Sequence, residues 1–143
     1  MQDRLKFRVW EKDQKIMKEC TQITLDKDQT GSMCDVKGKV TAHLIYQPHY
    51  IIMQCTGLRD KNGKLIYEGD IVKYAEYDWS DIAFKDWEQE IGKVVWGGNH
   101  SYPAFDLEKH NFECNSFAHI FNDGWTIEVI GNIYENEDLL NAT

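Results

Sequence analysis

The stretch TGLRDKNGKLIYEGDIV, residues 56–72, says more about the fold of this chain than any other segment. Asn62-Gly63 supplies two residues that tolerate positive φ, as a tight hairpin turn requires. Asp60 and Lys61 add polar turn chemistry immediately before that dipeptide. An apolar run resumes at residues 65–67, so the first half of the stretch predicts a β-hairpin, and none of its residues has an evident catalytic role.

The second half of the stretch predicts another turn and a core strand. Glu68-Gly69-Asp70 is a turn sequence, and the β-branched and aromatic residues Ile71, Val72 and Tyr74 that follow it are typical of a buried strand. Further short strands are predicted on both sides by alternating polarity between turn residues. They are a hairpin at 7–17 with its turn at 11–15, and strands at 21–25, 43–46, 50–55, 90–96, 104–107 and 125–130, with a second short hairpin around Lys37-Gly38-Lys39.

Three segments depart from this strand pattern. Residues 26–33 are polar and are expected to form a loop. Trp79, Ile82, Ala83 and Trp87 fall at helical spacing behind a capping Ser80, which predicts a short helix. Residues 112–121 fit either a loop or one helical turn, because Phe117, Ile120 and Phe121 suit a helical face while Phe112 and Cys114 suit a strand.

Composition limits the classes of function. The formal net charge is −8 and the sequence pI is near 5.0, so phosphate backbones are repelled and generic nucleic-acid binding is disfavoured. An acidic surface that imitates nucleic acid stays open as an alternative to plain solubility. No apolar run reaches a membrane-spanning length and the N-terminus does not resemble a secretion signal, so we expect a cytoplasmic protein with no membrane association.

The cysteines and histidines do not form a recognisable metal motif. Cys20, Cys34, Cys55 and Cys114 are scattered without a CxxC pair, and reduced thiols are the expected state. The five histidines are equally dispersed, so no metal or other cofactor is expected. Gly97-Gly98 matches no phosphate-binding pattern and is expected to be a turn.

Three blocks of this sequence resemble the YopX family of phage and prophage proteins. They are FRVWEKDQKIM (residues 7–17), TGLRDKNGKLIYEGDIV (56–72) and WTIEVIGNIYENEDLL (125–140), and they occur in the order that the family shows. One departure is Glu137, where a proline is expected. The resemblance implies a small all-β protein whose C-terminal part is similar to an SH3-type barrel, encoded on mobile or viral DNA and without an established activity.

Periodicity alone indicates a barrel or a sandwich, and the resemblance favours the barrel. The expected architecture is mainly β, an SH3-type barrel with an N-terminal β-hairpin elaboration and one or two short helices. We expect one domain over 1–143, with N-terminal strands at 1–55, the barrel part at 56–136 and a tail at 137–143.

Aromatic residues are more numerous than one small barrel needs for its core. Because SH3-like barrels bind peptides in aromatic-lined grooves and aromatic side chains on strands can stack on bases, four of these residues are a candidate protein-binding patch. They are Tyr74, Tyr77, Trp79 and Trp96. The competing interpretation is that most of the aromatics lie in the core or in subunit contacts.

Three functions follow from these patterns. The first is a non-enzymatic, self-associating interaction module that binds a host or phage protein. The second is a nucleic-acid-related role, either as a mimic that occupies a host DNA-binding protein or as a single-strand binder. The third is an enzyme, such as a hydrolase that uses Asp78, Glu90 or Cys114, the last with His110 or His119 as its base; the sequence shows no assembled catalytic group, so no enzymatic activity is expected.

Overall fold

The structure is a computed structural model that describes residues 2–25, 32–36, 41–43, 50–76, 88–97, 103–108, 115–122 and 126–141. The expected mainly-β fold is confirmed, with two antiparallel sheets of which one is a curled half-barrel. The chain divides into two compact units, Met1–Leu58 and Arg59–Thr143. The expected organisation as a single domain with parts at 1–55 and 56–136 stays a prediction.

The first unit is built around strand β1 (Phe7–Glu11). β1 pairs on one side with β2 (Ile16–Leu25) and on the other with β5 (Tyr50–Arg59), so that Val9 lies opposite both Lys18 and Ile52. β3 (Ser32–Val36) and β4 (Thr41–His43) extend the sheet beyond β2, and the 3-10 helix η1 (Gln2–Leu5) precedes β1. The order is therefore β4-β3-β2-β1-β5.

The N-terminal hairpin predicted from residues 7–17 is confirmed as β1 and β2. β2 is longer than predicted, since it joins residues 16–17 and 21–25 into one strand whose pairing with β3 shifts register between Cys20 and Gln22. Val9 is fully buried and packs with Cys20, and Phe7, Tyr50 and Ile52 lie partly buried against them. The small core of this unit therefore comes from β1 and its two neighbours.

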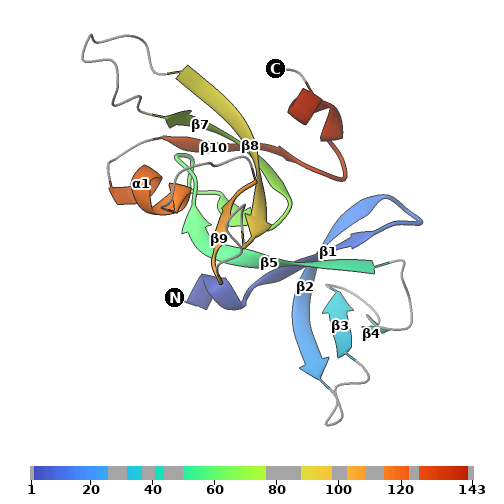
Figure 1. The fold of residues 1–143 in the computed structure, drawn as a ribbon. Coiled ribbons are helices and arrows are strands. Elements are labelled where there is room, and N and C mark those ends of the chain that lie inside the picture. The colour runs from blue at the N-terminus through green and yellow to red at the C-terminus, as the bar shows by residue number, and fades with distance from the viewer. Residues whose placement is uncertain are drawn as a thin grey trace, which may run out of the picture. The chain divides into compact units, whose positions relative to one another are not determined.

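The second unit is built around strand β7 (Asp70–Glu76). β7 lies between β8 (Glu88–Trp96) and β10 (Ile127–Asn132), and β9 (Phe105–Leu107) pairs with the far side of β8, which gives the order β10-β7-β8-β9 (Figure 1). Short strand β6 (Leu65–Tyr67) precedes β7, and the 3-10 helix η3 (Glu137–Asn141) contacts β8. The residues predicted as a tail thus include a helical turn.

Apolar side chains from all of these strands and from helix α1 (Ser116–Asn122) form the core of the second unit. Its fully or almost fully buried members are Ile66, Ile71, Val72, Val94, Leu107, Phe117, Ile120 and Ile127. The predicted core strand after the Glu68-Gly69-Asp70 turn is confirmed as β7. Gly69 adopts a φ of +80° there, and the Tyr67 backbone N–H donates a hydrogen bond to Asp70 Oδ2 at 2.8 Å.

Helix α1 begins where two polar side chains accept hydrogen bonds from its first turn. Asn115 Oδ1 accepts from the Ala118 backbone N–H at 3.1 Å, the usual N-cap contact. Asp106, whose side chain is fully buried in β9, accepts from the Ser116 backbone N–H at 3.0 Å and places a carboxylate at the helix N-terminus. The helical alternative for the ambiguous segment is therefore the observed one from Ser116 onwards.

Several predicted elements lie outside the described residues. These are most of the loop at 26–33, the turn at 37–39, the helix at 79–87 and residues 112–114. The end of that loop prediction is wrong, because Ser32 and Met33 begin β3, where they pair with β2. Gly97 does adopt the positive φ, +88°, expected of a turn after β8.

Residues 60–64, here called the Asp60 turn, connect the end of β5 to β6. The Gly63 backbone N–H donates to the Asp60 carbonyl oxygen at 2.9 Å, while neither Lys61 nor Asn62 has a positive φ and Gly63 does, at +80°. This is a type I turn followed by a left-handed glycine, one of the common longer hairpin connections. The prediction that Asn62 also uses positive φ is wrong, and the reason is the Asp60 side chain: its Oδ1 accepts from the backbone N–H groups of Asn62 and Lys64, each at 2.9 Å, which favours the type I geometry.

The Asp60 turn also binds the outer edge of β10. Asp60 Oδ2 accepts a hydrogen bond from the Val129 backbone N–H at 3.0 Å, and the Lys61 backbone N–H donates to the Ile127 carbonyl oxygen at 2.9 Å. Both β10 groups face away from β7 and would otherwise form an open sheet edge. One carboxylate, only 6% exposed, therefore both shapes the turn and attaches it to a strand almost seventy residues away.

We expect Asp60→Asn to lower the free energy of unfolding by about 1–3 kcal/mol, because the amide replaces one accepting oxygen with a donor that faces partly buried N–H groups. Urea unfolding at neutral pH measures the change. Lys61→Ala is the matched control: it keeps the backbone contact to Ile127 and removes only an exposed ion pair, so its effect should stay below about 1 kcal/mol. Equal losses in the two variants would contradict the role assigned to the carboxylate.

Asp60 should also make stability depend on pH. Burial raises the pKa of this carboxyl, but the hydrogen bonds from the backbones of Val129, Lys64 and Asn62 and the charge of Lys64 outweigh it, so the pKa lies below its ordinary value of 3.8. A lowered folded-state pKa contributes stability that is present above the unfolded-state pKa and lost as the pH falls through the folded-state value. The stability difference between the wild-type chain and Asp60→Asn should therefore be largest at neutral pH and shrink below pH 3.8. A difference that is constant from neutral to acid pH would contradict this linkage.

Candidate functional site

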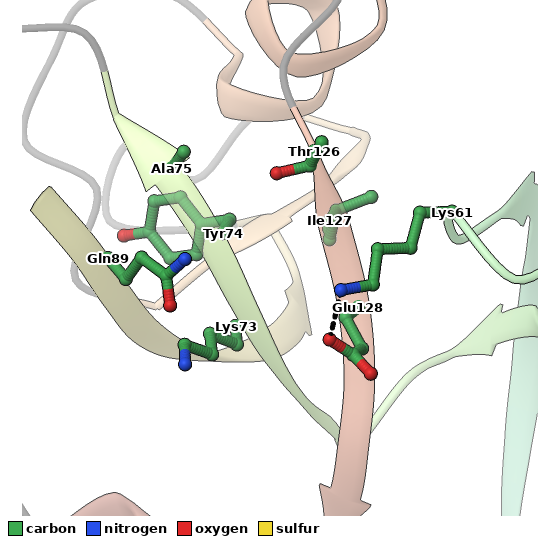
Figure 2. Close-up of a pocket in the computed structure, with 8 residues that line it drawn as sticks. All are labelled: Lys61, Lys73, Tyr74, Ala75, Gln89, Thr126, Ile127 and Glu128. Carbon is green, nitrogen blue, oxygen red and sulfur yellow. Dashed lines mark ion pairs between the residues drawn. The ribbon is translucent and has the colours of Figure 1, made fainter. Parts of the chain in front are cut away.

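A shallow pocket of about 70 Å³ lies where the Asp60 turn meets strands β7 and β10. It is lined by Lys61, Lys73, Tyr74, Ala75, Gln89, Thr126, Ile127 and Glu128 (Figure 2). Antiparallel register explains the grouping, since Glu128 lies opposite Lys73 and Ala75 lies opposite Gln89. Three neighbouring strands and one turn thus contribute to a mainly polar depression.

An ion pair forms one side of this pocket. Lys61 Nζ lies 2.5 Å from Glu128 Oε2, and the Asn62 side-chain amide donates to Glu128 Oε1 at 3.5 Å. The hydrogen bond from Lys61 lowers the pKa of Glu128, and the Lys61 charge acts in the same direction. Lys73 extends from β7 away from this pair in Figure 2 and is exposed. The lining can hydrogen-bond a small polar group, but it holds no nucleophile beside a base.

Of the four predicted contact residues, Tyr74 does not lie on an exposed patch. It is 7% exposed, and a Cβ at Gly92 on the neighbouring strand would lie only 3.3 Å from Tyr74 Cε1. The absence of a side chain at Gly92 therefore leaves room for the tyrosine ring beside Leu107. This placement corrects the expected exposure of Tyr74, because the register of β7 turns its ring towards the core.

Trp96 is the one predicted contact residue that the structure describes as exposed. It ends β8, and 52% of its surface is accessible. Its ring stands edge-on to Phe105 on the paired strand, with centroids 4.9 Å apart and an interplanar angle of 82°. Such a pairing favours one orientation of an exposed indole by about 0.5–1.5 kcal/mol. Tyr77 and Trp79 lie outside the described residues, so contact by these two stays a prediction.

Of the residues considered for catalysis, the structure describes the side chain of Glu90 alone. Glu90 is exposed on β8 opposite Tyr74, whereas Asp78, His110 and Cys114 lie outside the described residues and the side chain of His119 is likewise not described. Within the described ranges, no group of three or more His, Cys, Asp or Glu side chains could hold a metal ion. In the same ranges, no helix combines the length and the apolar character needed to cross a membrane.

The expectation of reduced thiols is wrong for Cys20 and for the cysteine to which it is bonded. Cys20 is disulfide-bonded, while Cys55 is buried and forms no disulfide. The sequence did not indicate this bond, because it contains neither a CxxC pair nor a secretion signal.

Sequence reasoning identified the Asp60 turn but missed its partner on β10. The signal in the sequence was an Asp two residues before Asn-Gly, which indicates a side chain that bonds its own turn. Nothing in the local pattern pairs this turn with Glu128 and Val129, since the contact spans most of the second unit.

Comparison with known proteins agrees with this fold. The crystal structure of protein EF1440 from Enterococcus faecalis is similar to this chain with a TM-score of 0.61 and 26% sequence identity, over 94% of this chain and 96% of that one. No curated protein matches the chain. The family described as YopX protein matches residues 6–141, nearly the full length, and the chain is therefore a member of the YopX family.

Proposed function

We propose that this protein is a non-catalytic interaction module, encoded by a phage or prophage, that self-associates and binds a host or phage protein in the cytoplasm. Neither the name of the family nor that of the similar protein from Enterococcus faecalis includes an activity. The observation that carries the proposal is the exposed Trp96, whose ring packs edge-on against Phe105.

The physical argument rests on the cost of ordering side chains in an interface. Tryptophan is enriched among the residues that contribute most to protein–protein binding, because one rigid ring buries a large apolar area. Trp96 is already held by its edge contact with Phe105 at 4.9 Å, so association loses little of its rotational freedom. Trp96 is the largest of the exposed apolar side chains in the described residues, the others being Leu5, Ile16 and Phe121.

Trp96→Ala should weaken self-association at least about tenfold, the effect expected for an interface hot spot. Sedimentation velocity across micromolar concentrations measures the association, and thermal unfolding checks that the fold is intact. Trp96→Phe keeps an aromatic ring, so its association constant should lie between those of the wild-type chain and Trp96→Ala. Phe121→Ser is the matched control, since it removes another exposed aromatic residue of the same unit.

A wild-type chain that stays monomeric throughout the concentration range would contradict self-association. Association that is unchanged in Trp96→Ala, or weakened equally by Phe121→Ser, would contradict the assignment of the interface to Trp96. If the chain associates as expected, affinity capture from infected or lysogenic cells with wild-type and Trp96→Ala baits then identifies proteins that depend on the same side chain.

The net charge of −8 separates this proposal from direct binding of nucleic acid. We expect no retardation of single- or double-stranded DNA in an electrophoretic mobility assay at low salt, because phosphates are repelled by a protein of the same sign. Tight binding that weakens with added salt would favour the alternative of a single-strand binder. A different result would support a nucleic-acid mimic: this chain does not bind DNA, but it captures a DNA-binding protein, and added DNA releases that protein. Mimicry of this kind is one form of the proposed interaction.

A further inference from the structure

Asn62 and Gly63 form a dipeptide that is prone to spontaneous deamidation, because Gly63 has no Cβ to obstruct attack by its own nitrogen. Both residues are exposed, and apart from the chain neighbours of Gly63 no residue has a heavy atom within 4 Å of the position a Gly63 Cβ would take. In this reaction the Gly63 nitrogen forms a bond to Asn62 Cγ and the Cγ–Nδ2 bond breaks. Ammonia leaves with the proton that the backbone amide lost. Water then opens the resulting succinimide at either carbonyl, giving aspartate or isoaspartate.

The native Asp60 turn opposes each requirement of this reaction. The attacking nitrogen must lose its proton, yet the Gly63 N–H donates a hydrogen bond to the Asp60 carbonyl oxygen at 2.9 Å. Ring closure also needs the Asn62 Cβ and the Gly63 nitrogen to eclipse one another. Asn62 is the third residue of the type I turn, where ψ is about 0°. At that angle its Cβ and the Gly63 nitrogen are rotated well away from the eclipsed arrangement.

Side-chain contacts hold Asn62 in that unreactive conformation. Its backbone N–H donates to Asp60 Oδ1 at 2.9 Å, and its Nδ2 donates to Glu128 Oε1 at 3.5 Å. Rotation of ψ therefore breaks contacts both within the turn and with β10. From this arrangement we propose that Asn62 is a protected deamidation site: the docked Asp60 turn suppresses the reaction, local opening permits it, and the product no longer docks normally on β10.

Deamidation changes two features on which the docked turn depends: the amide donor of the side chain at position 62 and, in isoaspartate, the length of the backbone. An aspartate at position 62 replaces the amide donor with a second carboxylate facing Glu128, close to the buried carboxylate of Asp60. An isoaspartate also adds a methylene to the backbone between Asp60 and Lys64, whose spacing allows one carboxylate oxygen to accept from both Asn62 and Lys64. Both products weaken the attachment of the turn, and neither reverts spontaneously to asparagine.

The first test compares deamidation rates. The full chain is incubated at mildly alkaline pH, folded and in urea, and conversion at position 62 is followed by peptide mass spectrometry with isoaspartate detection. We expect the folded chain to react roughly tenfold or more slowly than the unfolded chain, because the reaction waits for local opening. Glu128→Gln and Asp60→Asn should accelerate the folded-state reaction, the second variant more, and Asn62→Gln should abolish it at this position.

Equal rates in the folded and unfolded wild-type chain would overturn the proposal. If Asp60→Asn fails to fold, Glu128→Gln and Lys61→Ala remain as tests, since both alter only exposed contacts to Asn62 or Glu128. A folded-state rate unchanged in both would also overturn the protection mechanism.

The second test examines the product. Asn62→Asp should lower the melting temperature relative to wild type, and Asn62→Asp combined with Glu128→Gln should recover part of the loss because the facing carboxylate is gone. Asn62→Gln is the control for loss of the native side-chain length. An Asn62→Asp chain as stable as wild type, or a double variant no more stable than the single one, would contradict the proposed effect of the product.

Discussion

The buried carboxylate of Asp60 holds the second unit together at its hairpin edge. It accepts hydrogen bonds from three backbone N–H groups, two within its own turn and one on β10. The same side chain therefore determines the geometry of the hairpin turn and attaches that turn to β10. Because an ionised carboxylate forms stronger hydrogen bonds than a neutral acceptor, its charge is used to satisfy the backbone instead of to carry out chemistry.

A second aspartate has the same role at the opposite edge of the same sheet. Asp106 on β9 accepts from the backbone N–H groups of Leu107 and Ser116 and so links the outermost strand to the start of α1. The strand order β10-β7-β8-β9 leaves β10 and β9 as the two edges, and the contacts of Asp60 and Asp106 cover part of each. Open strand edges promote unwanted pairing between chains, which these two carboxylates oppose. Association through a side chain such as Trp96 is compatible with edges that are covered in this way.

The sequence predicted the elements that depend on local pattern. The N-terminal hairpin, the turn at Gly69 and the buried strand beginning at Ile71 follow from alternation and from glycines that permit positive φ, and all three are observed. It left open whether Tyr74 lies in the core or on a contact surface, because an aromatic residue on a strand faces the core or solvent according to a register that distant strands determine. The contact between Asp60 and Val129 was missed for the same reason: it joins parts of the chain whose proximity no local pattern encodes.

The ionised carboxylate of Asp60 thus accepts hydrogen bonds from the backbone N–H groups of Asn62, Lys64 and Val129. An acid titration followed by NMR, with the shifts of these three amide protons and of the Asp60 carboxyl carbon recorded in the same samples, tests this arrangement directly. We predict that all four signals follow one transition with an apparent pKa below the ordinary aspartate value of 3.8. Amides that titrate independently of the carboxyl carbon, or a shared transition at or above that value, would show that the carboxylate does not hold the turn and β10 together.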